Sequence, residues 1–171
     1  MLSKDLERQL GRVAPSGDGR IAYHPCAVTL VDGSIHERVY VQDAQSYISS
    51  WGVWPEDDPG KRYLDVSQVA VIRESADRLP AHIARAIYEA GESGMGYTVF
   101  TLVFRDRRTQ AYLSGNAVDF VTYPAGKSAQ DVASVHPHRG RDDHPSSDAT
   151  PYSWCLHGPG VSTASSKRWT G

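Results

Sequence analysis

The chain has 171 residues, a length that fits one domain. Its 18 Lys and Arg residues are balanced by 20 Asp and Glu residues, and the net charge of -2 argues against a nucleic-acid binder that works through a basic surface. No apolar run approaches the roughly 18 residues of a membrane span. The opening residues Met1 to Arg8 alternate charge and lack the apolar core of a secretory signal. We therefore expect a soluble, cytoplasmic protein without a membrane or nucleic-acid partner.

Composition divides the chain into three parts. Residues 1–20 contain a short helical pattern with Ser3 as N-cap, leucines on one face and Gly11 as its end, followed by a linker. Residues 21–126 hold nearly all other strand and helix signals and are predicted to be the folded domain. Residues 127–171 lack apolar periodicity and are rich in Ser, Pro and His, so we expect a flexible tail whose deletion leaves a folded domain.

The first predicted elements of the domain are strands and one helix. Two strand patterns, 27–31 and 35–41, flank Asp32-Gly33, which is a strong signal for a two-residue type I′ hairpin turn. A third strand is predicted over 63–72. A helix is predicted over 80–90, because Pro80 suits a first helical turn and a glycine follows the last one.

The second half of the domain is predicted to be a strand meander. The run 97–104 is almost entirely β-branched or aromatic, which favours a central strand, and strands over 109–114 and 118–123 follow it across polar turns. Short hairpin links favour antiparallel pairing. The sequence thus predicts an α+β domain, either a mainly antiparallel, strongly curved sheet or a small, partly open barrel, with one principal helix.

A glycine-rich loop, Gly91-Glu92-Ser93-Gly94-Met95-Gly96, lies between the predicted helix and the central strand. A nucleophile elbow would need glycine in place of Met95 and would run from strand to helix, whereas this loop runs from helix to strand. A catalytic Ser93 is therefore not favoured. We interpret the loop as a connector or a ligand-facing loop, with Glu92, Ser93, Gly94 and Gly96 as candidate contacts.

Two tryptophans, Trp51 and Trp54, lie close together just before the acidic run 56–58. They offer a large contact area, and the acidic neighbours suit a cationic ligand or a basic partner surface. The same residues could instead plug an open end of the core, and this interpretation is favoured. The acidic run lacks the spacing of a calcium loop and is typical of a solvated turn.

Asp119 falls inside a predicted strand, on the same face as Ala117 and Val121. If that face is covered, the carboxylate needs a partner, because an isolated buried charge is costly. The candidate partners are Arg73, Arg78, Arg85 and His82. A structural pair is favoured over a general base, and spacing alone does not support glycosidase-like pairing with Glu92.

Four histidines and one cysteine gather in the predicted tail: His136, His138, His144, Cys155 and His157. Such residues suit zinc, but their irregular spacing and the lack of a second cysteine do not favour a physiological site. Cys26 and Cys155 are far apart without a CxxC motif, so no disulfide framework is predicted. We expect neither a metal nor a cofactor, and none of His24, His36 and His82 forms a visible triad with Cys26 or Ser93.

The absence of a matched catalytic motif favours a non-catalytic binding or adaptor domain that recognises a protein or a small ligand through residues 51–60 and 91–96. Its candidate contacts are Trp51, Trp54, Glu92, Ser93, Gly94, Gly96 and Asp119. The alternative is a small hydrolase that uses Ser93 or a Glu92/Asp119 carboxylate pair. Either interpretation is compatible with a homo-oligomer.

Overall fold

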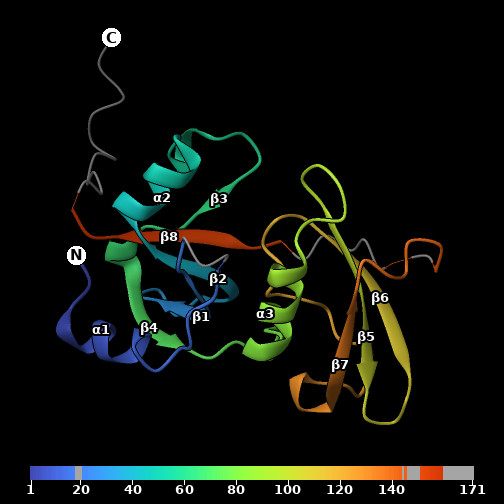
Figure 1. The fold of residues 1–171 in the computed structure, drawn as a ribbon. Helices are drawn as coiled ribbons and strands as arrows, with labels where there is room; N and C mark the ends of the chain where they lie inside the picture. The colour runs from blue at the N-terminus through green and yellow to red at the C-terminus, as the bar shows by residue number, and fades with distance from the viewer. Residues whose placement is uncertain (18–20, 144, 146–150, 160–171) are drawn as a thin grey trace.

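The computed structural model describes residues 1–17, 21–143, 145 and 151–159 and has an α+β fold. Within these residues, eight strands form two sheets, accompanied by the three helices α1 (Lys4–Leu10), α2 (Ala44–Trp51) and α3 (Ala81–Ala90) (Figure 1). The α+β class is as predicted. The described strands form two separate sheets where one curved sheet or a partly open barrel was expected, and α2 accompanies the one principal helix that was expected in the domain. None of the described helices has the length and apolar character needed to cross a bilayer.

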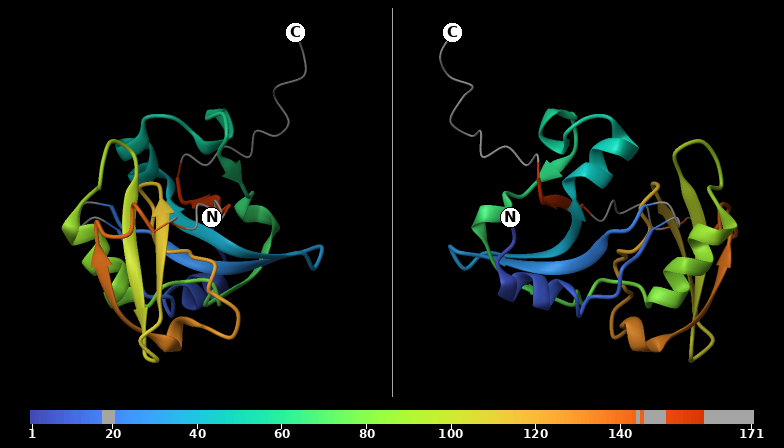
Figure 2. Two further views of the ribbon diagram at one scale, coloured as in Figure 1. Left: turned by 90° about the vertical axis from the view of Figure 1, so that its right-hand side faces the viewer. Right: turned by 60° about the vertical axis from the view of Figure 1, so that its left-hand side comes forward.

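The first sheet, called the mixed sheet, has five strands. Their order is β3 (Arg62–Tyr63), β8 (Ser153–His157), β2 (Ile35–Asp43), β1 (His24–Leu30) and β4 (Val69–Arg73). β8 runs parallel to both of its neighbours, whereas β1 is antiparallel to β2 and β4. The β1–β2 hairpin projects from the molecule in both views of Figure 2.

The second sheet, called the antiparallel sheet, has β5 (Thr98–Phe104) between β6 (Thr109–Ser114) and β7 (Val132–Pro137). The central position predicted for β5 is confirmed. α3 lies between this sheet and the mixed sheet (Figure 1). The helix buries Ile83 and Ile87 against the aromatic and aliphatic side chains of β5.

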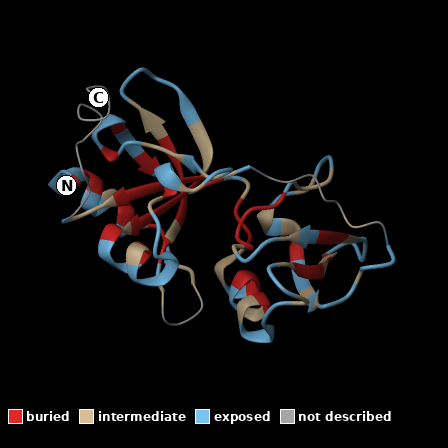
Figure 3. Cartoon of the chain, turned by 90° about the horizontal axis from the view of Figure 1, so that it is seen from above, coloured by how far each residue is buried: buried red, intermediate tan, exposed pale blue. Residues whose placement is uncertain are grey.

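The buried residues form three clusters, and Figure 3 shows them in red on both sides of the molecule. α1 covers one face of the mixed sheet through Leu6 and Leu10. α2 covers the other face, where Tyr40, Tyr47 and Trp154 dominate an aromatic cluster. The third cluster lies between α3 and the antiparallel sheet.

The predicted hairpin over β1 and β2 is confirmed, but its turn differs from the prediction. The Leu30 amide donates to Ser34 O at 2.9 Å and the Gly33 amide donates to Leu30 O at 2.9 Å, which closes a three-residue loop. Gly33 has φ +86°, while Asp32 is not among the described residues with positive φ. A type I′ turn needs positive φ at both central residues, so this turn is a type I turn followed by a glycine bulge.

Two segments that were predicted as single strands have a different structure. The segment 63–72 splits into β3, the 3₁₀ helix Val66–Gln68 and β4, because the Asp65 carboxylate accepts from the Ser67 amide at 2.8 Å and starts the 3₁₀ turn. The segment 118–123 forms no strand and makes one bridge, between Phe120 and Arg78. Asp119 therefore lies in an irregular crossing segment that joins two of the buried clusters.

Residues expected in a flexible tail are strands in the structure. β7 pairs with β5, and β8 lies inside the mixed sheet. Trp154, Cys155 and Leu156 are at most 2% exposed. The polar composition of this region conceals the three-residue apolar run Trp154-Cys155-Leu156, which forms the centre of the five-residue strand β8.

Candidate functional site

A cavity of about 270 Å³ opens between the ends of α2 and α3. Trp51 from α2, Tyr23 before β1 and Tyr88 from α3 form aromatic walls. Glu92 and Asn116 add polar groups from two loops of the antiparallel part. The cavity therefore brings together Trp51 and Glu92, one candidate from each of the two segments that the sequence singled out.

Trp51 reaches the cavity because it is the last residue of α2. The Asp43 side chain caps this helix by accepting from the Ser46 amide at 2.9 Å, and Gly52 ends it with φ +72°. The indole ring is 36% exposed and lies 6.2 Å from the Tyr47 ring. Lys61 Nζ sits 4.5 Å from the centroid of the indole ring, so this ring already contacts a cation.

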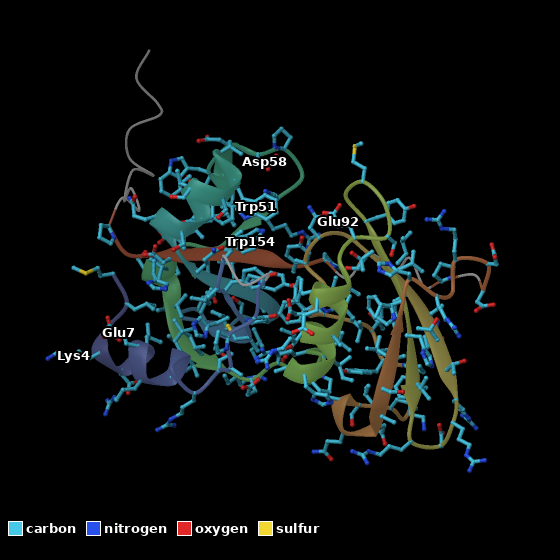
Figure 4. All side chains as sticks on the ribbon, in the orientation of Figure 1. Lys4, Glu7, Trp51, Asp58, Glu92 and Trp154 are labelled. Carbon is cyan, nitrogen blue, oxygen red and sulfur yellow. The ribbon has the colours of Figure 1, made fainter. Side chains whose placement is uncertain are left out.

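Glu92 follows α3 directly and lines the cavity while remaining exposed. Figure 4 shows it on the side of the loop that faces Trp51 and Trp154. Glu92 Oε2 accepts from the Gly96 amide at 3.2 Å. This bond holds the carboxylate against its own loop without burying it.

A chain of hydroxyl groups leads from the cavity wall to a buried carboxylate. The Tyr23 hydroxyl donates to Tyr88 Oη at 2.6 Å, and the Tyr88 hydroxyl donates to Asp119 Oδ2 at 2.5 Å. Tyr88 Oη also accepts from the Val118 amide at 3.1 Å. Burial, and then the neighbouring Asp119, raise the pKa of Tyr88 well above its ordinary value, so the hydroxyl stays protonated as a donor.

Asp119 is fully buried and is not a residue of the cavity wall. Burial raises the pKa of this carboxyl, although the hydroxyls of Ser16 and Tyr88 and the guanidinium of Arg78 counteract the rise. Oδ1 makes no hydrogen bond of regular geometry among the described residues, although Ser16 and Tyr40 lie close enough to lower the pKa. The partners are thus mainly hydroxyls, and Arg78 contributes at longer range.

Ser93 lies beside a histidine that the sequence placed in the tail. His138 Nδ1 is 2.8 Å from Ser93 Oγ, and His138 Nε2 is 3.0 Å from Ala90 O. A carbonyl oxygen accepts only, so Nε2 is protonated, and in the neutral imidazole Nδ1 then accepts from the Ser93 hydroxyl, whose other acceptor within reach is Val99 O at 3.3 Å. Ser93 Oγ also accepts from the Val99 amide at 2.8 Å.

The glycine loop packs on itself through the amides of Ser93, Gly94 and Gly96. The Ser93 and Gly94 amides donate to Tyr97 O at 3.0 and 3.3 Å, and the Gly96 amide donates to Glu92. A side chain at Gly94 would place its Cβ 2.3 Å from the Tyr97 ring, so the ring would have to move to accommodate it. Gly94 and Gly96 are thus loop-shaping residues and are not part of the cavity wall.

The remaining sequence candidates lie apart from the cavity. Trp54 occupies the N-cap position of the 3₁₀ helix Pro55–Asp57 without a side-chain capping bond, and it packs partly buried against the aromatic cluster of the mixed sheet. Burial raises the pKa of Cys155 to about 12. His144 lies outside the described residues, and within them no three His, Cys, Asp or Glu side chains are grouped to hold a metal ion.

Sequence reasoning missed Tyr23, Tyr88 and Asn116. A signal for the tyrosines is present in the composition, because the chain has 9 Tyr and only 3 Phe. A buried tyrosine needs a partner for its hydroxyl, so this excess indicates a core with internal hydrogen bonds. The fold alone reveals that two of these hydroxyls lie beside the cavity.

Comparison of the chain with protein-family models, with curated proteins and with solved structures finds no match in any of the three. The functional argument therefore rests on the cavity and its residues.

Proposed function

We propose that this chain is a non-catalytic binding protein that takes a small molecule into the cavity between α2 and α3. The observation that carries the proposal is that Trp51 and Glu92, which are remote in sequence, line the same cavity. Aromatic and aliphatic side chains make up most of its wall, with a few polar groups among them. This combination is typical of small-molecule sites in proteins.

The size of the cavity favours a small ligand over a peptide. Its volume of about 270 Å³ lies just below the roughly 300–1,000 Å³ that is usual for drug-sized ligands. The hydroxyl chain from Tyr23 to Asp119 keeps one wall in place, because each hydroxyl is held by its neighbour. A wall that is ordered before binding costs less to order on binding.

A titration of the full chain with a panel of fragment-sized aromatic and aliphatic compounds, followed by ligand-observed NMR, tests this proposal. We expect at least one compound to bind, and we expect Trp51→Ala to weaken its binding about tenfold or more, as for a central aromatic contact. Val53→Ala is the matched control, because Val53 is similarly exposed, at 37%, but does not line the cavity. Failure of every compound to bind, or binding that is unchanged in Trp51→Ala, would overturn the proposal.

A second candidate, a hydrolase centred on Ser93, is favoured by one observation. The Ser93–His138–Ala90 chain resembles a nucleophile, a base and a group that orients the base. The Val99 amide, however, already donates to Ser93 Oγ, and the amides of Ser93, Gly94 and Gly96 are engaged within the loop. Three amides of this loop are therefore already engaged within it, and we assign the dyad to loop structure.

The Ser93→Ala variant decides between the two roles. We expect any measured hydrolysis of a simple activated ester to be nearly unchanged in the variant, because Ser93 is not a nucleophile in the proposed role. Folding is checked in parallel by circular dichroism. A drop in kcat of about a thousandfold in a folded variant would establish the hydrolase instead.

The two carboxylates of the alternative hydrolase do not face the same cavity. Glu92 is exposed at the cavity, whereas Asp119 is buried and does not line it. Paired carboxylates in glycosidases must both face the substrate. Glu92 therefore enters the proposal as a ligand contact, and Asp119 enters it as a support for Tyr88.

A further inference from the structure

The charge of the cavity wall is negative. Glu92 supplies a carboxylate, and no lysine, arginine or histidine is among the described residues that line the cavity. Lys61, which lies over the Trp51 ring, already has an ion-pair partner in Asp58 at 2.9 Å. An anionic ligand would therefore meet a carboxylate without a compensating cation, whereas a cationic ligand would find a counterion.

The end of α3 adds to this negative potential. Ile87, Tyr88 and Gly91, which belong to the last turn of α3 or follow it, line the cavity. The carbonyl end of a helix carries a partial negative charge, and α3 has no basic residue in its own last turn. His138 Nε2 donates to one of the terminal carbonyls, Ala90 O, and the other carbonyls of this end keep their partial charge. The helix end and the Glu92 carboxylate thus act in the same direction from adjacent positions.

The aromatic walls suit a cation as well as an apolar group. The rings of Trp51, Tyr23 and Tyr88 all border the cavity. Aromatic faces attract ammonium groups, and tryptophan attracts them most strongly. The chain itself uses this property, because Lys61 Nζ lies over both the Trp51 and the Tyr47 rings.

We propose that the ligand of the cavity is a small organic cation whose charge is surrounded by apolar groups, such as a substituted ammonium ion. This inference rests on the proposed small-molecule function and narrows it to one chemical class. Glu92 and the end of α3 balance the charge, while Trp51 and the two tyrosines contact the apolar groups that carry it. A neutral ligand of the same shape would contact the aromatic walls but would gain no charge interaction with the Glu92 carboxylate.

The test compares choline with 3,3-dimethylbutan-1-ol, an uncharged compound of nearly the same shape. Both are titrated into the full chain and followed by ligand-observed NMR. We expect choline to bind at least about tenfold more tightly, which corresponds to a cation held by aromatic faces and a counterion. Equal affinity for the two compounds, or no binding of choline, would overturn the cationic class.

Three variants locate the effect. Glu92→Gln keeps the shape of the side chain and removes its charge, so we expect choline affinity to fall about tenfold and the affinity of the neutral compound to stay unchanged. Glu89→Gln is the matched control, because Glu89 is an exposed carboxylate of α3 outside the cavity wall, and we expect no change. Trp51→Ala should weaken binding of both compounds.

The outcomes separate this inference from the proposed function. If both compounds bind equally and Trp51→Ala weakens both, the cavity is a small-molecule site and the cationic class is wrong. If choline binds but Glu92→Gln leaves its affinity unchanged, the role given to Glu92 is wrong and the inference fails. If neither these compounds nor the fragment panel bind, the proposed function fails together with the inference.

Discussion

The two sheets of this protein are assembled in different ways. The antiparallel sheet and α3 come from one continuous stretch, residues 81–137, and β5 pairs with both of its neighbours. The mixed sheet instead takes in β8, which enters between β2 and β3 from much later in the chain. The antiparallel sheet thus depends on local signals, whereas the mixed sheet depends on one distant strand.

Among the changes that test this comparison of the two sheets, removal of β8 should have the largest effect on stability. A chain that ends after residue 143 keeps every strand of the antiparallel sheet but loses the neighbour that β2 and β3 share. We expect the cooperative melt of the parent to be lost, because the aromatic cluster loses Trp154 and Leu156. Circular dichroism melts and amide NMR dispersion measure this. A truncated chain with a parent-like Tm would instead show that residues 144–171, the removed part of the tail expected over 127–171, are dispensable.

Matched large-to-small substitutions compare the cores of the two sheets. Trp154→Ala in the mixed sheet and Phe100→Ala in the antiparallel sheet each remove a buried aromatic ring, and each should lower the free energy of unfolding by about 3–5 kcal/mol. We expect one shared transition in denaturant for both variants, because the hydroxyl chain from Tyr23 through Tyr88 to Asp119 links residues of both parts. Two separate transitions would show that the sheets unfold independently.

The junction after α3 should respond to backbone strain. Gly91 has φ +78° and ψ -177°, a region that is nearly exclusive to glycine. A Cβ at Gly91 or at Gly115 would meet nothing within 4 Å, but only Gly91 has a positive φ. Gly91→Val should therefore cost roughly 1–2 kcal/mol or more. In urea unfolding, Gly115→Val should cost clearly less. Equal costs would remove strain as the reason for glycine at Gly91.

The smallest expected effect concerns pH. Burial raises the pKa of Asp119 above its ordinary value of 3.8, so above pH 3.8 the folded state holds this proton more tightly than the unfolded state does. Lowering the pH from 7 toward 4 should therefore stabilise the parent relative to Asp119→Asn. His157 has a pKa lowered by burial, which gives the opposite trend below pH 6.5, but this trend cancels in the comparison. A difference in stability that does not change with pH would contradict the raised pKa.

Local patterns predicted the elements whose partners are close in sequence. Ser3 caps α1 as expected, Gly91 ends α3, and the hairpin of β1 and β2 forms around Asp32 and Gly33. These features depend on hydrogen bonds and backbone preferences within a few residues, which a sequence states directly.

The sequence also contains a signal for α2, although this helix is not among the predicted elements. Ala44, Tyr47, Ile48 and Trp51 are spaced as one face of a helix, after Asp43 as N-cap. The parallel strand β8 offers no comparable signal, because parallel neighbours need no turn between them and its apolar run is short. The position of a strand in a sheet is set by contacts that only the folded chain makes.

The candidate site likewise combines residues that the sequence singles out with an arrangement that only the folded chain creates. Trp51 and Glu92 stand out in the local sequence. Trp51 is a large aromatic residue close to a second tryptophan, and Glu92 is a charged residue in a glycine-rich loop. Their shared cavity depends on how α2 and α3 approach each other, which no local pattern encodes. Asp119 was expected to pair with a positively charged side chain, but its nearest partner is the hydroxyl of Tyr88.

The position of β8 also affects how the chain folds during synthesis. β2 ends at Asp43 and β8 begins at Ser153, so the β1–β2 hairpin exists for a long time before its neighbour has been made. During that time, one edge of β2, with the apolar residues Val39 and Val41, offers unpaired amides and carbonyls. Such an edge readily pairs with another chain. Synthesis of many copies of the chain close together should therefore favour aggregation through the edge of β2. A chaperone that binds extended apolar segments should suppress this aggregation.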